Sequence, residues 1–235
     1  MPGLMEADDL GTYVVKFRGA AQGTRALIAE IVAGELARAL DLPIPQLAIV
    51  ELDPQLARSE PDPELQRLLA TSAGDNVGLD YLPGALNWEP ALPPPDPALA
   101  AAIVWFDALV GNMDRTARNP NLLRWHRRHY LIDHGAALYF HHRWDGHLAR
   151  AADPFPLIRQ HVLLPYAGDL RAADAALAPR VSEALLRDLV AAVPDAWLDM
   201  EPTAAATRDG YVAHLRARLA APRAFVEEAA RARGV

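Results

Sequence analysis

The segment that most constrains the fold is an apolar stretch at the centre of the chain, residues 98–112, with the sequence ALAAAIVWFDALVGN. Its apolar side chains are spread around the whole circumference of a helix, and Asp107 is its only charged residue. A helix of this kind must be buried on all sides at the centre of a domain. We therefore expect a globular domain that is built around residues 98–112.

A proline-rich connector, LNWEPALPPPDP (86–97), precedes this apolar segment. Proline-rich stretches of this kind mark boundaries between compact units, because few contacts cross them. The sequence therefore predicts two lobes, an N-terminal lobe of residues 1–90 and a C-terminal lobe of residues 91–235 with a helical tail.

The N-terminal lobe is predicted to be rich in β-strands and to carry one long helix. Runs of β-branched and aromatic residues favour strands, and Thr24 can cap a helix that Pro43 and Pro45 bring to an end. The expected elements are strands at 12–17, 46–53 and 76–85, a helix at 24–40 and a short helix at 64–70.

The C-terminal lobe is predicted to be larger and mainly helical. Two short apolar runs, NLLRW (121–125) and HYLIDHG (129–135), flank a basic turn and are expected to pair as a hairpin. Further helices are expected at about 181–193, 204–220 and 222–233. The fold class is therefore α+β with two lobes.

The composition excludes several functional classes. The net charge of −7 argues against a general nucleic-acid-coating role, which needs a basic surface, although a local basic groove is compatible with it; we expect no direct nucleic-acid binding. There is no cysteine, and hence no thiolate metal site. No window of ~18 uncharged apolar residues is present, so a membrane span is not expected. The N-terminus is acidic and has no apolar core of a signal peptide, so we expect a cytoplasmic protein.

Oxygen-bearing side chains cluster around the predicted hairpin. Asp114 and Asn119 lie just before its first strand, and Asp133 ends its second strand. Because the two ends of an antiparallel hairpin return to the same edge, Asn119 and Asp133 should converge, with Asp114 just upstream. Carboxylate and amide oxygens suit Mg²⁺, and a second carboxylate can accept a proton from a hydroxyl. This set of groups favours phosphoryl transfer.

Here the sequence resembles a known family. The patterns D-R-x-x-x-N (114–119) and I-D-x-G (132–135) are similar to the catalytic and metal-binding segments of the protein-kinase-like superfamily. The order TYVVKF, LIAEIVAGELARALDLPIP, FDALVGNMDRTARN and LIDHG resembles that of HipA-like serine/threonine kinases over residues 12–140. The resemblance implies a two-lobed protein-kinase-like fold, and ATP and Mg²⁺ as cofactors.

The resemblance also implies roles for individual residues. Asp114 corresponds to the catalytic base, while Asn119 and Asp133 correspond to the Mg²⁺ ligands. Lys16 is the only lysine of the chain beside 22 arginines, and it corresponds to the lysine on the ATP phosphates, where a compact ammonium is suited. The residues implied for the other contacts are Glu30, with Glu35 as the alternative, to orient Lys16, and Leu79, Tyr81 and Leu82 as the hinge at adenine.

Some positions depart from the kinase pattern. Thr116 stands where a histidine is common, and His134 stands where ordinary kinases carry phenylalanine. Asn121 offers a second amide near the metal. No G-x-G-x-x-G loop is present, and only eleven residues precede the strand that carries Lys16, so strands that normally cover ATP can be missing. The segment RGAAQGT (18–24) is the candidate phosphate loop.

Three functions are consistent with these patterns. The first is a kinase that phosphorylates a protein serine or threonine, with a regulatory partner protein encoded elsewhere. The second is a degenerate kinase fold that acts as a binding or regulatory module. The third is a small-molecule or lipid kinase, although the chain has no basic patch for a membrane. A histidine metal site is disfavoured, because no H-E-x-x-H motif is present.

Overall fold

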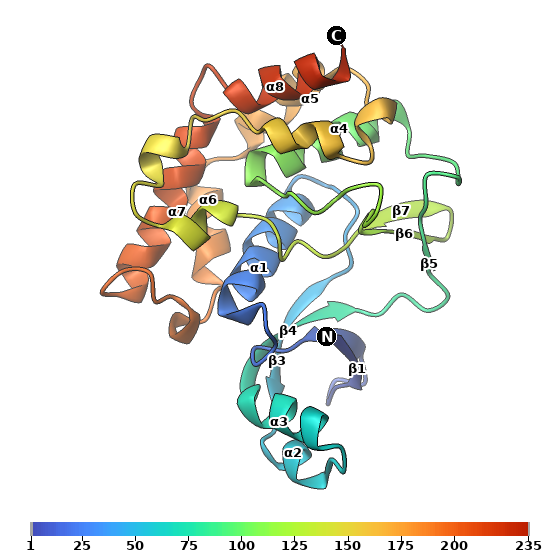
Figure 1. Ribbon diagram of the computed structural model, residues 1–235, viewed down its shortest axis with the longest axis vertical. Coiled ribbons are helices and arrows are strands. Elements are labelled where there is room, and N and C mark those ends of the chain that lie inside the picture. The colour runs from blue at the N-terminus through green and yellow to red at the C-terminus, as the bar shows by residue number, and fades with distance from the viewer. Residues whose placement is uncertain (1, 235) are drawn as a thin grey trace.

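The computed structural model describes residues 2–234. The N-terminal part forms a four-stranded antiparallel sheet of β1 (Pro2–Glu6), β2 (Thr12–Lys16), β3 (Leu47–Leu52) and β4 (Gly74–Asp80), in the order β1-β2-β4-β3. Helix α1 (Gly23–Ala39) follows β2 and lies between this sheet and the rest of the molecule (Figure 1). Lys16, the last residue of β2, therefore lies close to α1.

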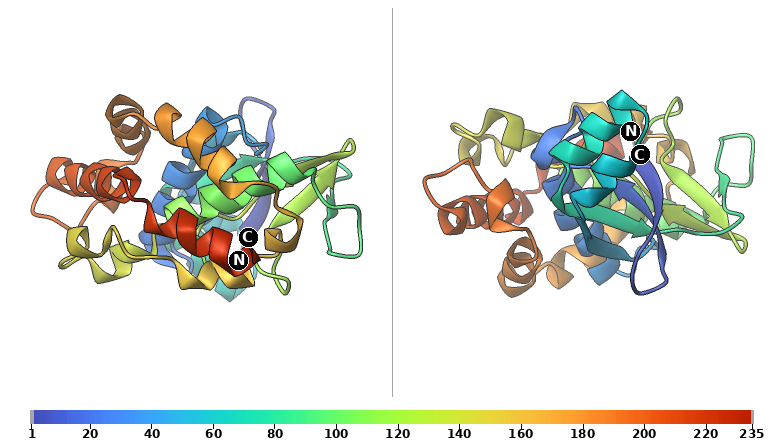
Figure 2. Two further views of the ribbon diagram at one scale, coloured as in Figure 1. Left: turned by 90° about the horizontal axis from the view of Figure 1, so that it is seen from above. Right: turned by 90° about the horizontal axis from the view of Figure 1, so that it is seen from below.

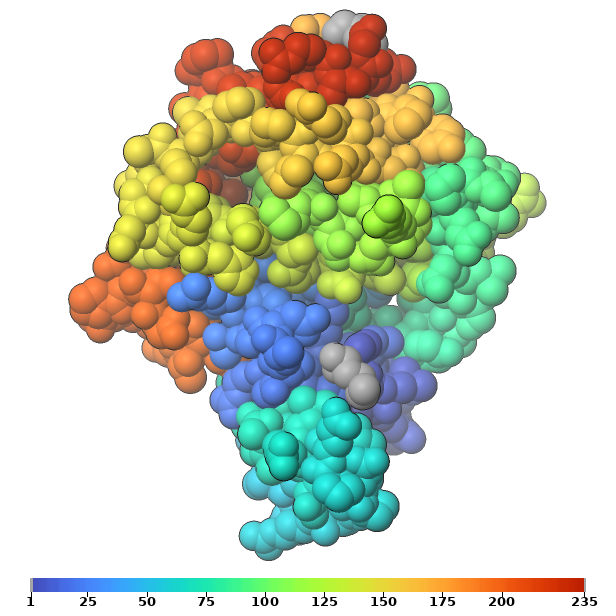
Figure 3. Space-filling view, viewed as in Figure 1, coloured from blue at the N-terminus to red at the C-terminus, as the bar shows by residue number. Residues whose placement is uncertain are grey.

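Successive side chains along a strand point to opposite faces of a sheet, and the two faces of this sheet pack against different parts of the chain. Val77 and Leu79 of β4 belong to the large core that contains α1. Val15 and Leu52 point to the opposite face, where they form a small separate cluster with residues of α3 (Pro63–Thr71). Together with α2 (Gln55–Ser59), α3 makes the narrow projection at one end of the molecule (Figure 3).

The apolar helix of the sequence is α4 (Pro97–Val110), and it is buried at the centre of the C-terminal part. The side chain of Asp96 caps its first turn, and Gly111 ends it in the left-handed conformation with φ +64°, which glycine adopts without steric cost. Helices cover α4 from outside (Figure 2). They are α5 (Leu170–Leu177), α7 (Ala204–Leu219) and α8 (Ala224–Arg233), whereas α6 (Glu183–Ala191) packs against α7 and α1.

A second sheet holds the hairpin that the sequence predicts. Strands β6 (Leu122–Trp125) and β7 (Arg128–Leu131) pair antiparallel, and the short β5 (Leu86–Asn87) pairs with β6. The connector thus joins the second sheet at residue 86, close to where the sequence places the lobe boundary; the boundary at residue 90 itself stays a prediction.

One hydrophobic core joins α1 to the C-terminal part. Leu27, Ile28 and Ile31 of α1 belong to the same cluster of buried residues as α4 and the helices around it. Because α1 packs on the sheet with one side and on the C-terminal helices with the other, the residues of α1 are held in fixed positions between them. Within residues 2–234, no helix is both long enough and apolar enough to cross a membrane.

The predicted and observed elements differ in a few places. The sequence patterns predict no strand before residue 12, whereas β1 occupies Pro2–Glu6 and pairs with β2. The expected strand at 76–85 ends at Asp80, and the expected strand at 129–135 ends at Leu131. In the second case the cause is visible, because Asp133 has a positive φ of +56° that no strand accommodates.

Candidate active site

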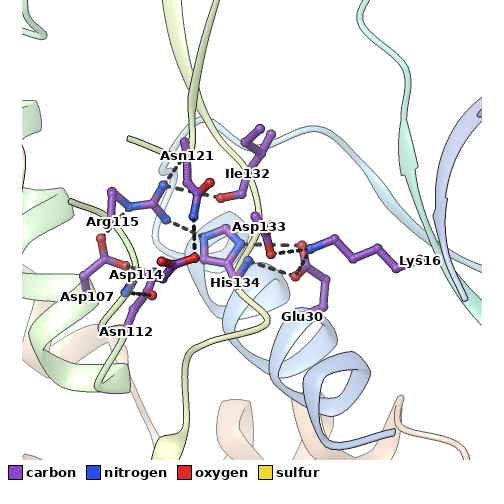
Figure 4. A network of polar contacts seen from close by, with 10 residues as sticks. All are labelled: Lys16, Glu30, Asp107, Asn112, Asp114, Arg115, Asn121, Ile132, Asp133 and His134. Atoms are coloured by element: carbon purple, nitrogen blue, oxygen red, sulfur yellow. Dashed lines mark hydrogen bonds and ion pairs between the residues drawn. The ribbon is translucent and has the colours of Figure 1, made fainter. Parts of the chain in front are cut away.

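Lys16 is held by two carboxylates that come from distant parts of the chain. It lies at the end of β2 opposite Val77, on the face of the sheet that turns toward α1. Its Nζ donates to Oε2 of Glu30 at 2.8 Å and to Oδ1 of Asp133 at 2.6 Å (Figure 4). Although burial opposes the charge, these two anions raise the pKa of Lys16. The ammonium therefore joins the sheet, α1 and the end of the hairpin.

Of the two glutamates that the sequence proposes as the lysine partner, the structure brings Glu30 to Lys16. Glu30 lies on the inner side of α1 and is completely buried, and it also accepts a hydrogen bond from the backbone N–H of His134 at 2.8 Å. Glu35 lies more than one turn further along and pairs with Arg38 on its own helix. Burial raises the pKa of Glu30, and the ammonium of Lys16 opposes this effect.

Asp133 stands just beyond the hairpin in the left-handed conformation. Aspartate tolerates this conformation better than most residues, and such backbone positions gather at functional sites. About half of its side chain is exposed (49%), so it can reach a ligand. Burial favours the neutral carboxyl, but Lys16 and the backbone N–H of Gly135 outweigh it and lower the pKa of Asp133.

The loop after α4 presents Asp114 next to two amides. Residues Thr116 and Asn119 close a tight turn through reciprocal backbone hydrogen bonds, and this turn brings the Asn119 side chain back to Asp114. Asn119 donates from Nδ2 to Oδ2 of Asp114 at 2.6 Å, and Asn121 donates to the same oxygen at 3.4 Å. Asp114 is thus fixed by the residues that the sequence proposes as its neighbours.

Beneath this loop lies a buried ionic network. Asp107 of α4 accepts from Nε of Arg115 at 2.6 Å, from Nε2 of His161 at 2.8 Å and from the amide of Asn112 at 3.0 Å. Burial alone would raise the pKa of Asp107, but Arg115 and His161 outweigh it and lower that pKa strongly. The network anchors both ends of the segment that carries Asp114.

Arg115 also reaches the hairpin. Its Nη1 donates to the backbone carbonyls of Asn121 and Ile132, and its Nη2 lies 3.3 Å from Nε2 of His134 (Figure 4). In the sequence Arg115 and Arg118 stand close to Asp114, and the pattern alone is consistent with either binding a substrate or pairing with an acid. The signal that points to the acid is Asp107, because a lone carboxylate on an otherwise apolar buried helix needs a cation.

Lys16, Asp114 and Asp133 line one cavity of about 210 Å³. The other walls come from Pro2, from Phe17 and the segment after it, and from Gly135 and Ala136. The turn of the β1–β2 hairpin does not cover this cavity, because β1 pairs with β2 so that Pro2 lies opposite Lys16 and the turn lies at the far end of both strands.

The segment 18–24 borders the cavity and is held in place from the sheet side. The backbone N–H of Arg18 donates to the side chain of Asn76 at 2.8 Å, and that of Gly19 donates to Ser72 at 3.0 Å. A Cβ at Gly19 would stand 2.1 Å from Oγ1 of Thr71, so no other residue fits without movement. This candidate phosphate loop is therefore closely packed against the end of α3.

The three proposed hinge residues lie on β4 and directly after it. Leu79 is paired with Val14, two positions from the pair of Lys16 and Val77, and therefore on the same face of the sheet. Leu79 and Leu82 are buried, and 39% of Tyr81 is exposed. The backbone N–H of Tyr81 donates to the carbonyl of Thr12 at 2.9 Å. None of the three is among the residues that line the cavity.

The donor set for a metal is small. Within residues 2–234, no group of three or more histidine, aspartate or glutamate side chains is arranged to hold an ion. Most histidines outside the Asp-His-Gly segment serve packing, as in the stack of Phe140 on His214 with ring centroids 3.6 Å apart. A metal at Asp133 would need amide, water and phosphate oxygens to complete its coordination, which is how Mg²⁺ is commonly bound.

A small antiparallel sheet with a lysine, a helix that returns a glutamate to this lysine, and a helical part that adds two aspartates define a protein-kinase-like fold. The chain belongs to the HipA-like kinase family, since the family model of that description matches residues 2–225. The fold class and the family predicted from the sequence are thus confirmed. This places the protein among kinase-like phosphotransferases, whose chemistry implies ATP and a divalent metal ion.

A solved structure shows the same fold. The crystal structure of a Helicobacter pylori proinflammatory kinase CtkA superposes on this chain with a TM-score of 0.55, covering 98% of this chain and 94% of that chain at 13% sequence identity. At this identity the similarity concerns the fold alone. No curated protein sequence matches the chain significantly. The roles of the individual site residues therefore stay predictions.

Proposed function

We propose that this protein transfers the γ-phosphoryl group of Mg²⁺-bound ATP to a serine or threonine hydroxyl of a protein. The observation that carries the proposal is Lys16, whose ammonium bridges Glu30 and Asp133 at the edge of a cavity that Asp114 also lines. In phosphoryl transfer, catalysis is mainly positioning and neutralisation of charge. In the proposed arrangement Lys16, held by Glu30, would neutralise charge on the phosphates, and Asp114 would position the acceptor.

The residues present fit the implied cofactors. Asp133 offers a half-exposed carboxylate, and Asn119 and Asn121 offer amide oxygens, which are the hard donors that Mg²⁺ prefers. When bound, the ion would neutralise charge on the phosphates. Lys16 would bind the phosphates while Glu30 holds it in place. The segment 18–24 would line the phosphates, and Leu79, Tyr81 and Leu82 would contact adenine.

Asp114 is the group that we assign to the acceptor hydroxyl. Its Oδ2 is fixed by Asn119 and Asn121, so its other oxygen, Oδ1, is oriented for a second partner. In this role Asp114 would position the hydroxyl and accept its proton while the hydroxyl oxygen forms its bond to the γ-phosphorus and the bond from that phosphorus to the leaving ADP breaks. General-base catalysis of this kind requires hydrogen-bond reach between the base and the proton that it removes.

The test compares wild type with Asp133→Ala. We expect wild type to show Mg²⁺-dependent ATP turnover and autophosphorylation, and Asp133→Ala to lose both. Equal, metal-independent activity in the two proteins would overturn the proposal. A small-molecule or lipid acceptor would show instead as turnover that only such an acceptor stimulates.

The second candidate is a degenerate kinase fold that acts as a binding module. The observation that favours it is the cavity of about 210 Å³, because small-molecule sites usually measure roughly 300–1,000 Å³. Thermal melting separates the two candidates. A nucleotide at 100 times its Kd stabilises a protein by about 2.7 kcal/mol. We expect Mg²⁺·ATP to raise the melting temperature, and no shift at millimolar nucleotide would favour the second candidate.

Lys16→Arg is expected to impair ATP use although it keeps the charge. The ammonium fits between two carboxylates at 2.6 and 2.8 Å, whereas a planar guanidinium cannot take the same place. A lost hydrogen bond to a charged group costs about 1.5–3 kcal/mol, so kcat/KM for ATP should fall roughly ten- to hundredfold. The matched control is Arg38→Lys on the exposed side of α1, which should leave kcat/KM unchanged. Full activity of Lys16→Arg would remove Lys16 from the phosphate site.

A further inference from the structure

His134 is buried between the two halves of the site. Its ring has no exposed surface and packs edge-on against Phe106. Nε2 lies 3.3 Å from Nη2 of Arg115, and Nδ1 lies 4.0 Å from Oε1 of Glu30. Within the chain as described, neither His134 Nδ1 nor Glu30 Oε1 has a hydrogen-bond partner. Two buried polar atoms that both lack a hydrogen-bond partner, a ring nitrogen and a carboxylate oxygen, therefore lie near each other (Figure 4).

The contact with Arg115 fixes which ring nitrogen carries the proton. A guanidinium has only donors, so Nε2 must be the acceptor in this contact. A neutral imidazole with an acceptor at Nε2 has its hydrogen on Nδ1. The hydrogen is thus on the nitrogen that faces Glu30, and a shift of ~0.5–1 Å would make the contact a hydrogen bond.

The carboxylate of Glu30 needs such a donor most when nucleotide is bound. Its Oε2 accepts from Lys16 and from the backbone of His134, while Oε1 is left without a donor in a fully buried place. If Lys16 also donates hydrogen bonds to phosphate, its hydrogen bond to Glu30 becomes weaker. A buried charged oxygen without hydrogen bonds is costly, and the Nδ1–H of His134 is the group in position to compensate it.

We infer that His134 is a positioning residue whose Nδ1–H binds Glu30 while its Nε2 accepts from Arg115, so that the phosphate-binding lysine and the catalytic loop are held in one arrangement. Phenylalanine, which ordinary kinases carry at this place, has the shape for this position but neither hydrogen bond. The expected effect on ATP binding requires that Lys16 binds phosphate, and it therefore rests on the proposed function. The tautomer of His134 does not depend on it.

Three substitutions separate the two hydrogen bonds from the shape of the ring. His134→Phe keeps the ring and removes both polar atoms. His134→Asn keeps an amide at the place of Nδ1, and His134→Gln keeps one at the place of Nε2. We expect the KM for ATP to rise about tenfold in the Gln variant, which loses the hydrogen bond to charged Glu30, and at least as much in the Phe variant, which loses both hydrogen bonds. In the Asn variant it should stay within about threefold, because Arg115 keeps its hydrogen bonds to Asp107 and to two backbone carbonyls. The change in kcat should be smaller.

A second measurement needs no nucleotide. In ¹⁵N NMR spectra of the wild-type protein, the ring of His134, assigned from the signal that His134→Asn lacks, should show a protonated Nδ1 and an unprotonated Nε2. A proton on Nε2, or equal KM values in the Phe and Asn variants, would overturn the inference. If wild type binds no ATP, the proposed function fails, and the NMR result alone decides the hydrogen bonding of His134.

Discussion

Asp114→Asn is expected to lower the rate of phosphoryl transfer by about 10²–10⁴-fold, the usual contribution of a general base. Asparagine has the size of aspartate, so the turn that Asn119 closes should form as before. Its amide cannot accept the proton of the acceptor hydroxyl. The affinity for Mg²⁺·ATP should change little, because the substitution leaves Lys16 and Asp133, the proposed contacts of the nucleotide and its metal ion, in place.

The measurement is single-turnover phosphorylation of the acceptor, or of the protein itself, together with nucleotide binding by thermal melting. Asp188→Asn, the same change on the exposed side of α6, is the matched control and should show wild-type rates. A fall in kcat without a change in nucleotide affinity assigns Asp114 to the acceptor. An equal loss of nucleotide affinity would place Asp114 at the metal instead, and an unchanged rate would remove it from the chemistry.

The elements that form the site follow from local patterns in the sequence. The apolar helix 98–112 must be buried, and its glycine ends it where the loop with Asp114 begins. The hairpin pattern brings the residues before and after it to one edge. These relations are fixed over short sequence distances, so residue spacing alone predicts them.

Contacts across long distances in the chain could not be predicted in the same way. Lys16 and Asp133 are 117 positions apart, and either glutamate of α1 has a helical position that could face the lysine. Only the packing of α1 between the sheet and the C-terminal helices selects Glu30. The left-handed conformation of Asp133 is likewise imposed by its surroundings, because strand propensity alone continues β7 to Gly135.

The role of the buried charges depends on tertiary structure in a further way. Asp107 on its apolar helix signals a hydrogen-bonded interior, but the sequence offers several arginines as partners. The structure places Arg115 there and extends it to His134, so that a support for the loop also touches the Asp-His-Gly segment. The sequence alone does not indicate a role for this histidine, because its role depends on Arg115 and Glu30, which only the fold brings next to it.

Asp107→Leu is expected to cause the largest loss of stability among single substitutions at the site. Its carboxylate and the guanidinium of Arg115 have no exposed side-chain surface, and removal of one partner leaves the other charge buried. Breaking such a pair costs about 3–5 kcal/mol, and for a chain of this size the melting temperature should fall by roughly 6–20 °C. Asp188→Leu, the same change at an exposed position of α6, is the control and should shift the melting temperature little.

The pair should behave differently when both partners are replaced. In Asp107→Leu combined with Arg115→Met no charge is left buried, so the double variant should be more stable than Asp107→Leu alone. Because the folded protein holds the pKa of Asp107 below its ordinary value of 3.8, its carboxylate stabilises the fold fully above that value. The difference between wild type and Asp107→Leu should therefore be constant near neutral pH and shrink as the pH falls below 3.8. If the double variant is no more stable than Asp107→Leu, the loss comes from the cavity and from Asn112 and His161, and the ion pair is not what holds the loop of Asp114.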